Sequence, residues 1–229
     1  MFSNVSLRPK THHGSLKFLA AIALCASILA AGTRSTADAA QSSTASTLLV
    51  LGDSISAEYG LKRDSGWVRL LDTRLRKEGF RYDIVNASIG GETTSGGLSR
   101  IDELLARLHP AIVIVELGGN DGLRGLSLPT TEQNLAAIIA RSQKAGAAVQ
   151  LIGMQLPPNY GKAYTDRFAA IYAQAAKRYR TSLTPFFFAG FAERYDLFQS
   201  DRIHPSEAAQ VRLLDNVWPA LRPLLKASR

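Results

Sequence analysis

Short apolar runs alternate with longer amphipathic segments over most of this chain of 229 residues. Apolar runs of a few residues between turn residues are typical of buried strands, and apolar residues at intervals of three and four are typical of helices with one buried face. The expected strands are 47–51, 83–85, 111–117, 148–154 and 182–185. The expected helices are 67–78, 98–108, 131–144, 163–179 and a last one that begins at Pro205 and runs towards Leu225.

Strands and helices follow one another alternately in this pattern. Such alternation predicts a single α/β domain over residues 47–229, in three layers, with a five-stranded parallel sheet between helices. Ligands of such sheets bind outside the carboxyl ends of the strands. Residues that directly follow a strand are therefore candidates for a site, and residues that directly precede one are not.

The first 39 residues have the features of a secretory signal peptide. Basic residues precede an apolar run at 18–32, and Ala37-Asp38-Ala39 follows as a cleavage site. The run is shorter than the roughly 20 residues that span a membrane, although a retained signal anchor is an alternative. We therefore expect cleavage near Ala39, a flexible lead-in at residues 40–46, and a periplasmic or secreted protein.

Composition narrows the classes of partner. The formal net charge of the chain is +8, and removing residues 1–39, which hold four basic residues and one acidic residue, leaves +5. Lysine and arginine are scattered rather than clustered on one helix face, which argues against nucleic-acid binding. Cys25, the only cysteine, lies in the predicted signal peptide, so the remaining domain has neither a disulfide nor a cysteine metal site. A monomer without stable membrane insertion is expected.

A serine follows the first expected strand. This strand runs into Gly52-Asp53-Ser54, where a glycine lets the chain turn sharply and the serine hydroxyl can reach the ligand edge of the sheet. By itself the motif fits a helix cap or a phosphate-binding turn as well as it fits a nucleophile.

The positions of the histidines favour the interpretation of Ser54 as a nucleophile. An alcohol needs a base to attack at neutral pH, and histidine is the usual one. Beyond residue 39 the chain contains only His109 and His204. His109 precedes the third strand, at the wrong edge of the sheet, and is expected to be a surface residue at a helix end. His204 follows the last strand and is the predicted general base.

Asp201 lies three residues before His204, so a short turn can fold its carboxylate back onto the imidazole. There it would fix the tautomer and stabilise the imidazolium that forms during attack. A turn or helix-cap role is the alternative interpretation of Asp201. Asp196 and Glu193 are possible substitutes that lack this local geometry.

Acyl transfer also needs hydrogen-bond donors for the developing oxyanion. The second strand leads into residues 86–93, a glycine-containing loop that can expose a backbone N–H. The third leads into residues 117–122, where the Asn120 amide is a ready donor. Either loop alone is compatible with ordinary turn chemistry. Three consecutive strands that deliver suitable groups to one edge favour a catalytic site.

Together these residues resemble the four blocks of the SGNH, or GDSL-type, hydrolase family. The matching motifs are Gly52-Asp53-Ser54, Gly91, Gly118-Gly119-Asn120-Asp121 and Asp201-x-x-His204. The resemblance extends over about 47–225 and implies a flavodoxin-like sheet of order 2-1-3-4-5 and no metal or organic cofactor. It also implies an oxyanion hole made by the backbone N–H groups of Ser54 and Gly91 and by the Asn120 amide.

Longer strings resemble one group within this family. Leu-Gly-Asp-Ser-Ile-Ser-Ala from Leu51 and Leu-Pro-Pro-Asn-Tyr-Gly from Leu156 are similar to its bacterial periplasmic members that act as thioesterases, lysophospholipases and arylesterases. This resemblance implies a small-molecule acyl ester or thioester as the substrate. Ile55 stands where the family often has leucine, and we expect it to pack beneath the nucleophile.

The loops after the third and fourth strands are expected beside the site. Leu126, Leu156 and Pro157 are predicted to line an acyl groove, with simple packing over the sheet end as the alternative. Residues 186–188, all phenylalanine, are expected in the core. The competing functions are a carbohydrate acetyl-esterase of the same family, with a shallow polar site, and a non-catalytic lipid or peptidoglycan binder.

Overall fold

The computed structural model describes residues 45–226, which contain a parallel five-stranded sheet in the order β2-β1-β3-β4-β5. This is the flavodoxin-like order expected from the sequence. The predicted signal peptide, residues 1–39, lies outside the described residues. The strands are β1 (Ser46–Gly52), β2 (Tyr82–Asn86), β3 (Ile112–Glu116), β4 (Ala148–Ile152) and β5 (Ser182–Thr184).

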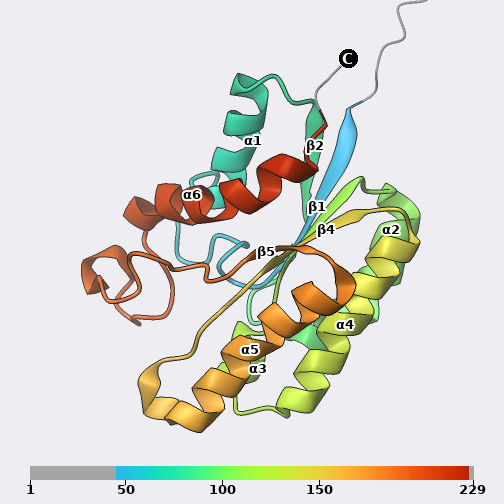
Figure 1. Ribbon diagram of the computed structural model, residues 1–229. Coiled ribbons are helices and arrows are strands. Elements are labelled where there is room, and N and C mark those ends of the chain that lie inside the picture. Colours follow the sequence, from blue (N-terminus) through green and yellow to red (C-terminus); the bar gives the residue numbers. More distant parts are fainter. Residues whose placement is uncertain (1–44, 227–229) are drawn as a thin grey trace, which may run out of the picture. The chain divides into compact units, whose positions relative to one another are not determined.

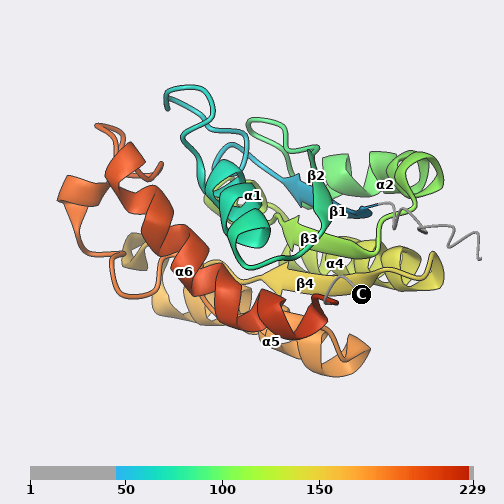
Figure 2. The same cartoon turned by 90° about the horizontal axis from the view of Figure 1, so that it is seen from above.

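Helices cover both faces of this sheet (Figures 1 and 2). One face carries α1 (Trp67–Lys77) and α6 (Gln210–Leu221), which contact each other. The other face carries α2 (Thr94–Leu108), α4 (Leu128–Lys144) and α5 (Lys162–Tyr179), with α4 in contact with both of its neighbours. The predicted three-layer α/β/α architecture is confirmed.

Two helices begin about one turn earlier than the apolar spacing indicates, because capping residues start them. Thr93 accepts a hydrogen bond from the Gly96 N–H at the start of α2. Ser127 accepts one from the Thr130 N–H at the start of α4. Such caps satisfy N–H groups that have no partner within the helix, whether or not the first turn is apolar.

The prediction is wrong at the start of the last helix. Pro205 forms an isolated antiparallel bridge with Phe198, and a 3₁₀ turn at Glu207–Ala209 precedes α6. A short helix, α3 (Gly119–Leu123), was not expected, because five residues with two glycines show no apolar period. The other 3₁₀ turns are Pro158–Tyr160, Tyr195–Leu197 and Arg222–Leu224.

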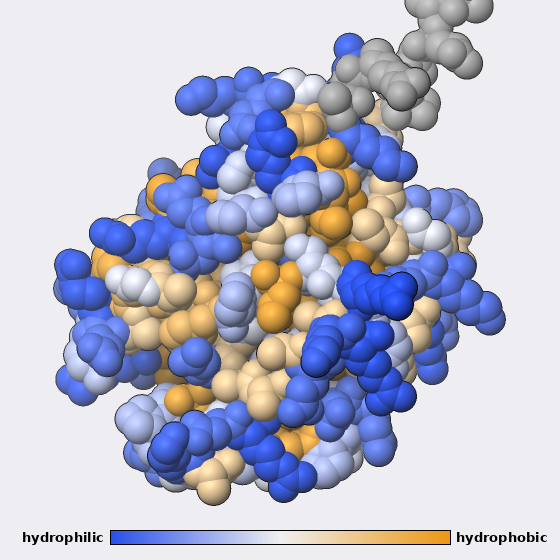
Figure 3. Space-filling view, in the orientation of Figure 1, coloured by the Kyte–Doolittle hydropathy of each residue, from blue (hydrophilic) through white to orange (hydrophobic). Residues whose placement is uncertain are grey.

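The hydrophobic core surrounds β1 and β3, which are two of the three inner strands of the sheet. Residues 48–51 of β1 and 113–115 of β3 are fully buried, as expected for parallel strands that are covered on both faces. On the face seen in Figure 3, apolar residues form small separate patches among polar ones. Within residues 45–226, every helix is too short or too polar to cross a membrane.

The three consecutive phenylalanines at 186–188 belong to this core, as predicted. Phe187 is fully buried, and its two neighbours pack against the core. The Phe188 ring contacts both Phe191 and Phe198. Because Phe198 directly precedes the segment with Asp201 and His204, this aromatic cluster anchors that segment to the body of the domain.

Candidate active site

Ser54 lies in a tight turn directly after β1, at the carboxyl end of the sheet. The turn is closed by hydrogen bonds from Ala57 N–H to the Asp53 carbonyl and from Tyr59 N–H to the Ser54 carbonyl, at 2.9 and 3.0 Å. Gly52 precedes it for a reason other than the expected one. A Cβ at Gly52 would lie 2.8 Å from side-chain oxygens of Glu116, Ser56 and Ser88, so glycine is needed for close packing rather than for an unusual φ.

The structure brings Ser54, His204 and Asp201 into one hydrogen-bonded line. Ser54 Oγ is 2.8 Å from His204 Nε2, and His204 Nδ1 is 2.8 Å from Asp201 Oδ2. A carboxylate beside Nδ1 favours the tautomer with the proton on Nδ1, which leaves Nε2 free to accept the proton of the Ser54 hydroxyl. These are the three residues predicted to form the catalytic line.

The short turn from Asp201 to His204 holds the carboxylate in place. Asp201 Oδ1 accepts hydrogen bonds from the backbone N–H groups of Ile203 and His204, at 2.9 and 3.0 Å. Arg202, directly after Asp201, has a left-handed backbone with φ 58°, which helps the chain to turn within this short segment. The possible substitute Asp196 is instead paired with Arg194.

The pKa of Asp201 lies below its ordinary value. Partial burial by itself raises this pKa, but the hydrogen bonds from the two backbone N–H groups and from the imidazole outweigh burial. The carboxylate is therefore ionised at neutral pH and can stabilise a positive charge on His204. His109, by contrast, is exposed and ends α2 at the opposite edge of the sheet, as predicted.

The groups predicted to form an oxyanion hole lie after β1, β2 and β3, with Ser54 and Gly91 on loops and Asn120 in α3. Within residues 45–226, no group accepts a hydrogen bond from the backbone N–H of Ser54 or Gly91. Gly91 has a φ of 74°, a conformation that favours glycine. The Arg124 guanidinium donates to the Gly91 carbonyl at 3.0 Å and so ties this loop to α3.

The Asn120 amide is held firmly in this arrangement. Its Nδ2 donates to Asp53 Oδ2 and to the Glu92 carbonyl, both at 3.0 Å. Both N–H bonds of the amide therefore have acceptors, and its nitrogen faces the residue that precedes Ser54. Donation to an oxyanion requires one of these bonds to be shared or exchanged.

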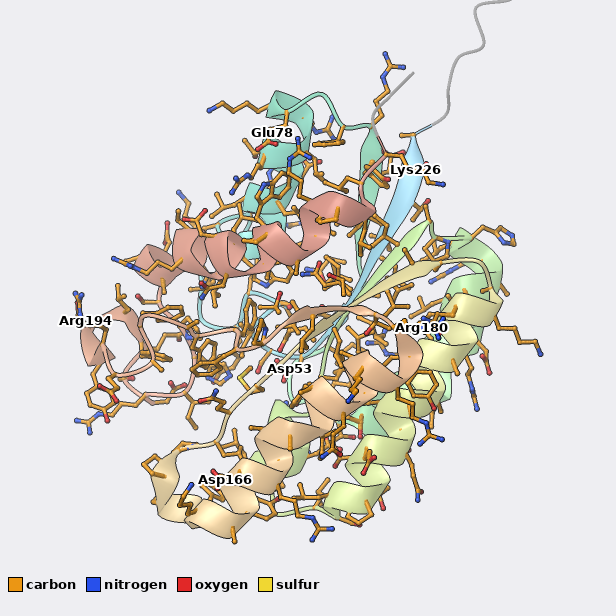
Figure 4. All side chains as sticks on the ribbon, viewed as in Figure 1. Asp53, Glu78, Asp166, Arg180, Arg194 and Lys226 are labelled. Atoms are coloured by element: carbon orange, nitrogen blue, oxygen red, sulfur yellow. The ribbon has the colours of Figure 1, made fainter. Side chains whose placement is uncertain are left out.

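Two buried carboxyl groups near Ser54, those of Asp53 and Glu116, form a pair that the sequence analysis did not predict. Glu116 Oε2 accepts from Ser56 Oγ at 2.7 Å and from the Asp53 N–H at 3.3 Å. Asp53 Oδ1 accepts from the Ile55 N–H at 3.0 Å. Figure 4 shows Asp53 in the middle of the molecule, whereas the labelled Arg194 lies on an outer loop. The backbone N–H groups of Asp53 and Ile55, the residues on either side of Ser54, are thus fixed by carboxyl oxygens.

Burial changes the proton affinity of both groups. It raises the pKa of Asp53 to about 6, against the opposing effects of the Ile55 N–H and of His204. It also raises the pKa of Glu116 well above its ordinary value, and the charge of Asp53 adds to this rise. The available sequence signal is a glutamate that ends the otherwise apolar run Ile-Val-Ile-Val-Glu, which closes at Glu116.

Replacing Glu116 by glutamine is expected to stabilise the protein increasingly as pH rises above the ordinary pKa of glutamate, because burial raises the pKa of Glu116. A carboxyl group whose pKa is raised on folding favours the folded state below its unfolded pKa, and this contribution is lost as pH rises through the folded pKa. Glutamine keeps an oxygen acceptor but never ionises. The gain should therefore be absent at low pH, where the glutamate is neutral in both the folded and the unfolded chain, and should grow as the unfolded chain ionises.

Thermal unfolding of wild type and Glu116→Gln at several pH values checks this expectation. Glu103→Gln, on the exposed side of α2, is the matched control and should show no pH-dependent difference. A constant difference in Tm between Glu116→Gln and wild type across the pH range would contradict a buried, pH-dependent charge at this position.

The predicted substrate-binding residues lie in different environments. Leu126 is 43% exposed, and Pro157 is exposed as well. Leu156 is only 8% exposed, and both of its methyl carbons lie within 2.9 Å of the place that a Cβ on Gly122 would occupy. Its side chain therefore packs against Gly122 of α3, and a role of Leu156 in lining a groove stays a prediction.

No group of three or more metal-binding side chains is present among residues 45–226. A serine, a histidine and an aspartate joined in this order, at the ligand edge of an α/β/α sheet, are the arrangement of a serine hydrolase. The chain belongs to the GDSL-like Lipase/Acylhydrolase family, which residues 50–212 match.

Known relatives align with most of this chain. It is 52% identical over 185 residues to the esterase TesA of Pseudomonas aeruginosa, covering 81% of this chain and 92% of the relative. It is 41% identical over 181 residues to thioesterase 1/protease 1/lysophospholipase L1 of Escherichia coli K12, covering 79% and 86% of the two chains. A crystal structure of TesA matches with a TM-score of 0.77 and 52% identity, over 78% of this chain and 99% of that one.

Proposed function

We propose that this protein hydrolyses carboxylic esters and thioesters of fatty-acyl or aryl groups, with Ser54 as nucleophile. The observation that carries this proposal is the line from Ser54 Oγ through His204 to Asp201, with 2.8 Å at each step. Relatives that cover most of the chain bear the names esterase and thioesterase/protease/lysophospholipase, which supports both bond types.

The proposed reaction passes through an acyl-enzyme. His204 Nε2 takes the proton of Ser54 as Oγ attacks the acyl carbon, and Asp201 stabilises the imidazolium. The tetrahedral intermediate collapses as the imidazolium gives its proton to the departing alcohol or thiol. Water then attacks the acyl-Ser54 ester, with His204 again as the base, and releases the carboxylic acid.

The oxyanion of each tetrahedral intermediate is held by three donors in this proposal. The Ser54 and Gly91 N–H groups have no acceptor within the described part of the chain, so they are available for it. The third donor is the Asn120 amide, which shares one of its N–H bonds now directed to Asp53 and Glu92. Donors placed before the reaction need no reorganisation when the charge develops.

Replacing Asn120 by alanine is expected to lower kcat roughly a hundredfold or more, because loss of one oxyanion donor costs about 2.7–4 kcal/mol of barrier. Steady-state hydrolysis of a p-nitrophenyl ester measures it. The matched control is Asn216→Ala, whose Nδ2 also donates to two acceptors, the carbonyls of Phe187 and Ala189. Turnover of Asn120→Ala near that of wild type would remove this amide from the oxyanion hole.

Activity on p-nitrophenyl esters is expected to peak at medium or long acyl chains rather than at acetyl. Four exposed apolar side chains stand on the loops that carry the site, which favours an apolar substrate over a carbohydrate. They are Tyr59, Ile89, Ile203 and Leu126, with exposed fractions of 57%, 50%, 44% and 43%. Activity confined to acetyl esters would favour a carbohydrate acetyl-esterase, and failure to react with a fluorophosphonate probe would favour a non-catalytic binder.

We also propose that residues 1–39 are a signal peptide, that the mature chain acts as a monomer in the periplasm or outside the cell, and that it needs no metal or organic cofactor. A basic segment, an apolar run at 18–32 and the Ala37-Asp38-Ala39 site support export. N-terminal sequencing of the protein from periplasmic and medium fractions tests export, and its elution volume in gel filtration tests the oligomeric state. Full activity after dialysis against a chelator is expected.

A further inference from the structure

Gln199 joins the turn of the nucleophile to the turn of the base. It lies directly after Phe198 and two residues before Asp201, in a segment without helix or strand. Its backbone N–H donates to the His204 carbonyl at 2.8 Å, and its carbonyl accepts from the Arg202 N–H at 2.9 Å. The main chain of Gln199 thus closes the loop in which Asp201 and His204 lie.

The side chain of Gln199 reaches across to the other turn. Its Nε2 donates to the Tyr59 carbonyl at 2.8 Å and approaches the Pro205 carbonyl at 3.4 Å. The Tyr59 N–H in turn donates to the Ser54 carbonyl at 3.0 Å. Hydrogen bonds therefore connect Ser54 to His204 through Tyr59 and Gln199, independently of the bond between the hydroxyl and the imidazole.

The turn of Ser54 is shaped to receive this amide. Gly60 has a φ of 70°, and a Cβ placed on it would lie 2.0 Å from Gln199 Oε1. The amide therefore occupies the space that the absence of a side chain at Gly60 leaves. The Tyr59 ring, on the same turn, packs on the His204 imidazole with ring centroids 4.4 Å apart.

The site needs such a connection, because Ser54 and His204 are 150 residues apart and neither lies in a helix or strand. Their separation depends on how two turns are held against each other. We propose that Gln199 is a positioning residue, which clasps the Ser54 turn to the His204 turn and so sets the distance for proton transfer between hydroxyl and imidazole. The inference rests on the proposed roles of Ser54 and His204.

The main test compares Gln199→Ala and Gln199→Met with wild type on a water-soluble p-nitrophenyl ester. Methionine keeps much of the volume but has no N–H to donate. Because a displacement of about 1 Å can cost about a hundredfold in rate, we expect kcat to fall roughly ten- to a hundredfold in both variants, with KM changed less than about twofold. Wild-type kcat in Gln199→Met, or a change confined to KM, would overturn the proposal.

Gln143→Ala is the matched control. Gln143 Nε2 also donates to a backbone carbonyl at 2.8 Å, that of Tyr179, but it lies at the end of α4 away from the site. A general loss of stability from one side chain–backbone hydrogen bond should lower Tm in both variants. Only the Gln199 variants should lose kcat, and an equal loss of kcat in Gln143→Ala would overturn the proposal.

Gly60→Ala approaches the same contact from the other side, and its comparison with Gly146→Ala alone serves if Gln199 variants do not fold. Its methyl group displaces the amide, so kcat should fall as in Gln199→Ala. In the Gln199→Ala background the added methyl has no amide to displace, so its effect on kcat should shrink several-fold, as expected for coupled neighbours. Gly146→Ala, at a φ of 89° with open space around it, controls for backbone strain alone. Equal effects of Gly60→Ala on kcat in wild type and in Gln199→Ala would overturn the proposal that Gln199 positions the two turns.

Ser54→Ala separates failure of this inference from failure of the proposed function. If Ser54→Ala is inactive while the Gln199 variants match wild type, the nucleophile stands and the positioning role is wrong. If Ser54→Ala keeps its activity, the proposed function fails, and the positioning role fails with it.

Discussion

Replacing Ser54 by alanine is expected to lower kcat by roughly a million-fold, which is the order of effect seen when the nucleophile of a serine hydrolase is removed. The Ser54 hydroxyl is the group that His204 Nε2 faces at 2.8 Å. Its removal leaves oxyanion donors and binding contacts but no activated oxygen. The fold should persist, because the turn is held by backbone hydrogen bonds and by Asp53 and Glu116.

Hydrolysis of p-nitrophenyl esters and labelling by a fluorophosphonate probe both measure this loss. Ser200→Ala, an exposed serine next to Asp201, should keep full activity and full labelling. A rate in Ser54→Ala within tenfold of wild type, in protein purified in the same way, would mean that another group attacks the substrate.

Replacing Asp201 by asparagine is expected to lower kcat by about ten-thousandfold near neutral pH. An asparagine amide facing His204 Nδ1 would donate a hydrogen bond to it, so the imidazole proton would move to Nε2. Nε2 would then face Ser54 as a donor and could not take its proton. The asparagine oxygen can still accept from the N–H groups of Ile203 and His204, so the turn itself should form.

The pH dependence of kcat/KM distinguishes this effect from simple disruption of the turn. Asp196→Asn is the control, because it removes an exposed carboxylate of the same region that is paired with Arg194. A loss smaller than about tenfold in Asp201→Asn would show that the carboxylate does not set the tautomer of His204.

The layers of the fold follow from local patterning. Each of the five strands and most helices could be placed within a few residues. The reason is that an element buried on one face shows periodic apolar residues, and a strand buried on both faces shows a continuous apolar run. The exceptions have physical reasons. The α3 helix (Gly119–Leu123) is too short to show a period, and Pro205 is used in a bridge to Phe198 instead of starting α6.

The candidate triad could also be predicted from the sequence. Ligands bind at the carboxyl ends of parallel strands, and the chain beyond residue 39 has only two histidines, so few choices remain. These two criteria indicate Ser54, Asp201 and His204, and the structure joins these residues by hydrogen bonds. Their catalytic roles await the substitutions described above. Gly91 came instead from the resemblance to a family, because a free backbone N–H has no signature in the sequence.

Other features of the site depend on contacts between distant segments. The proton affinity of Glu116 and Asp53 is set by burial, which removes water from groups that would otherwise be ordinary carboxylates. The packing of Leu156 against α3 likewise depends on the space that Gly122 leaves, which the spacing of residues in the sequence does not reveal. Alternation and spacing thus specify which residues meet at the sheet edge, while desolvation and close packing among residues far apart in the chain set their chemistry.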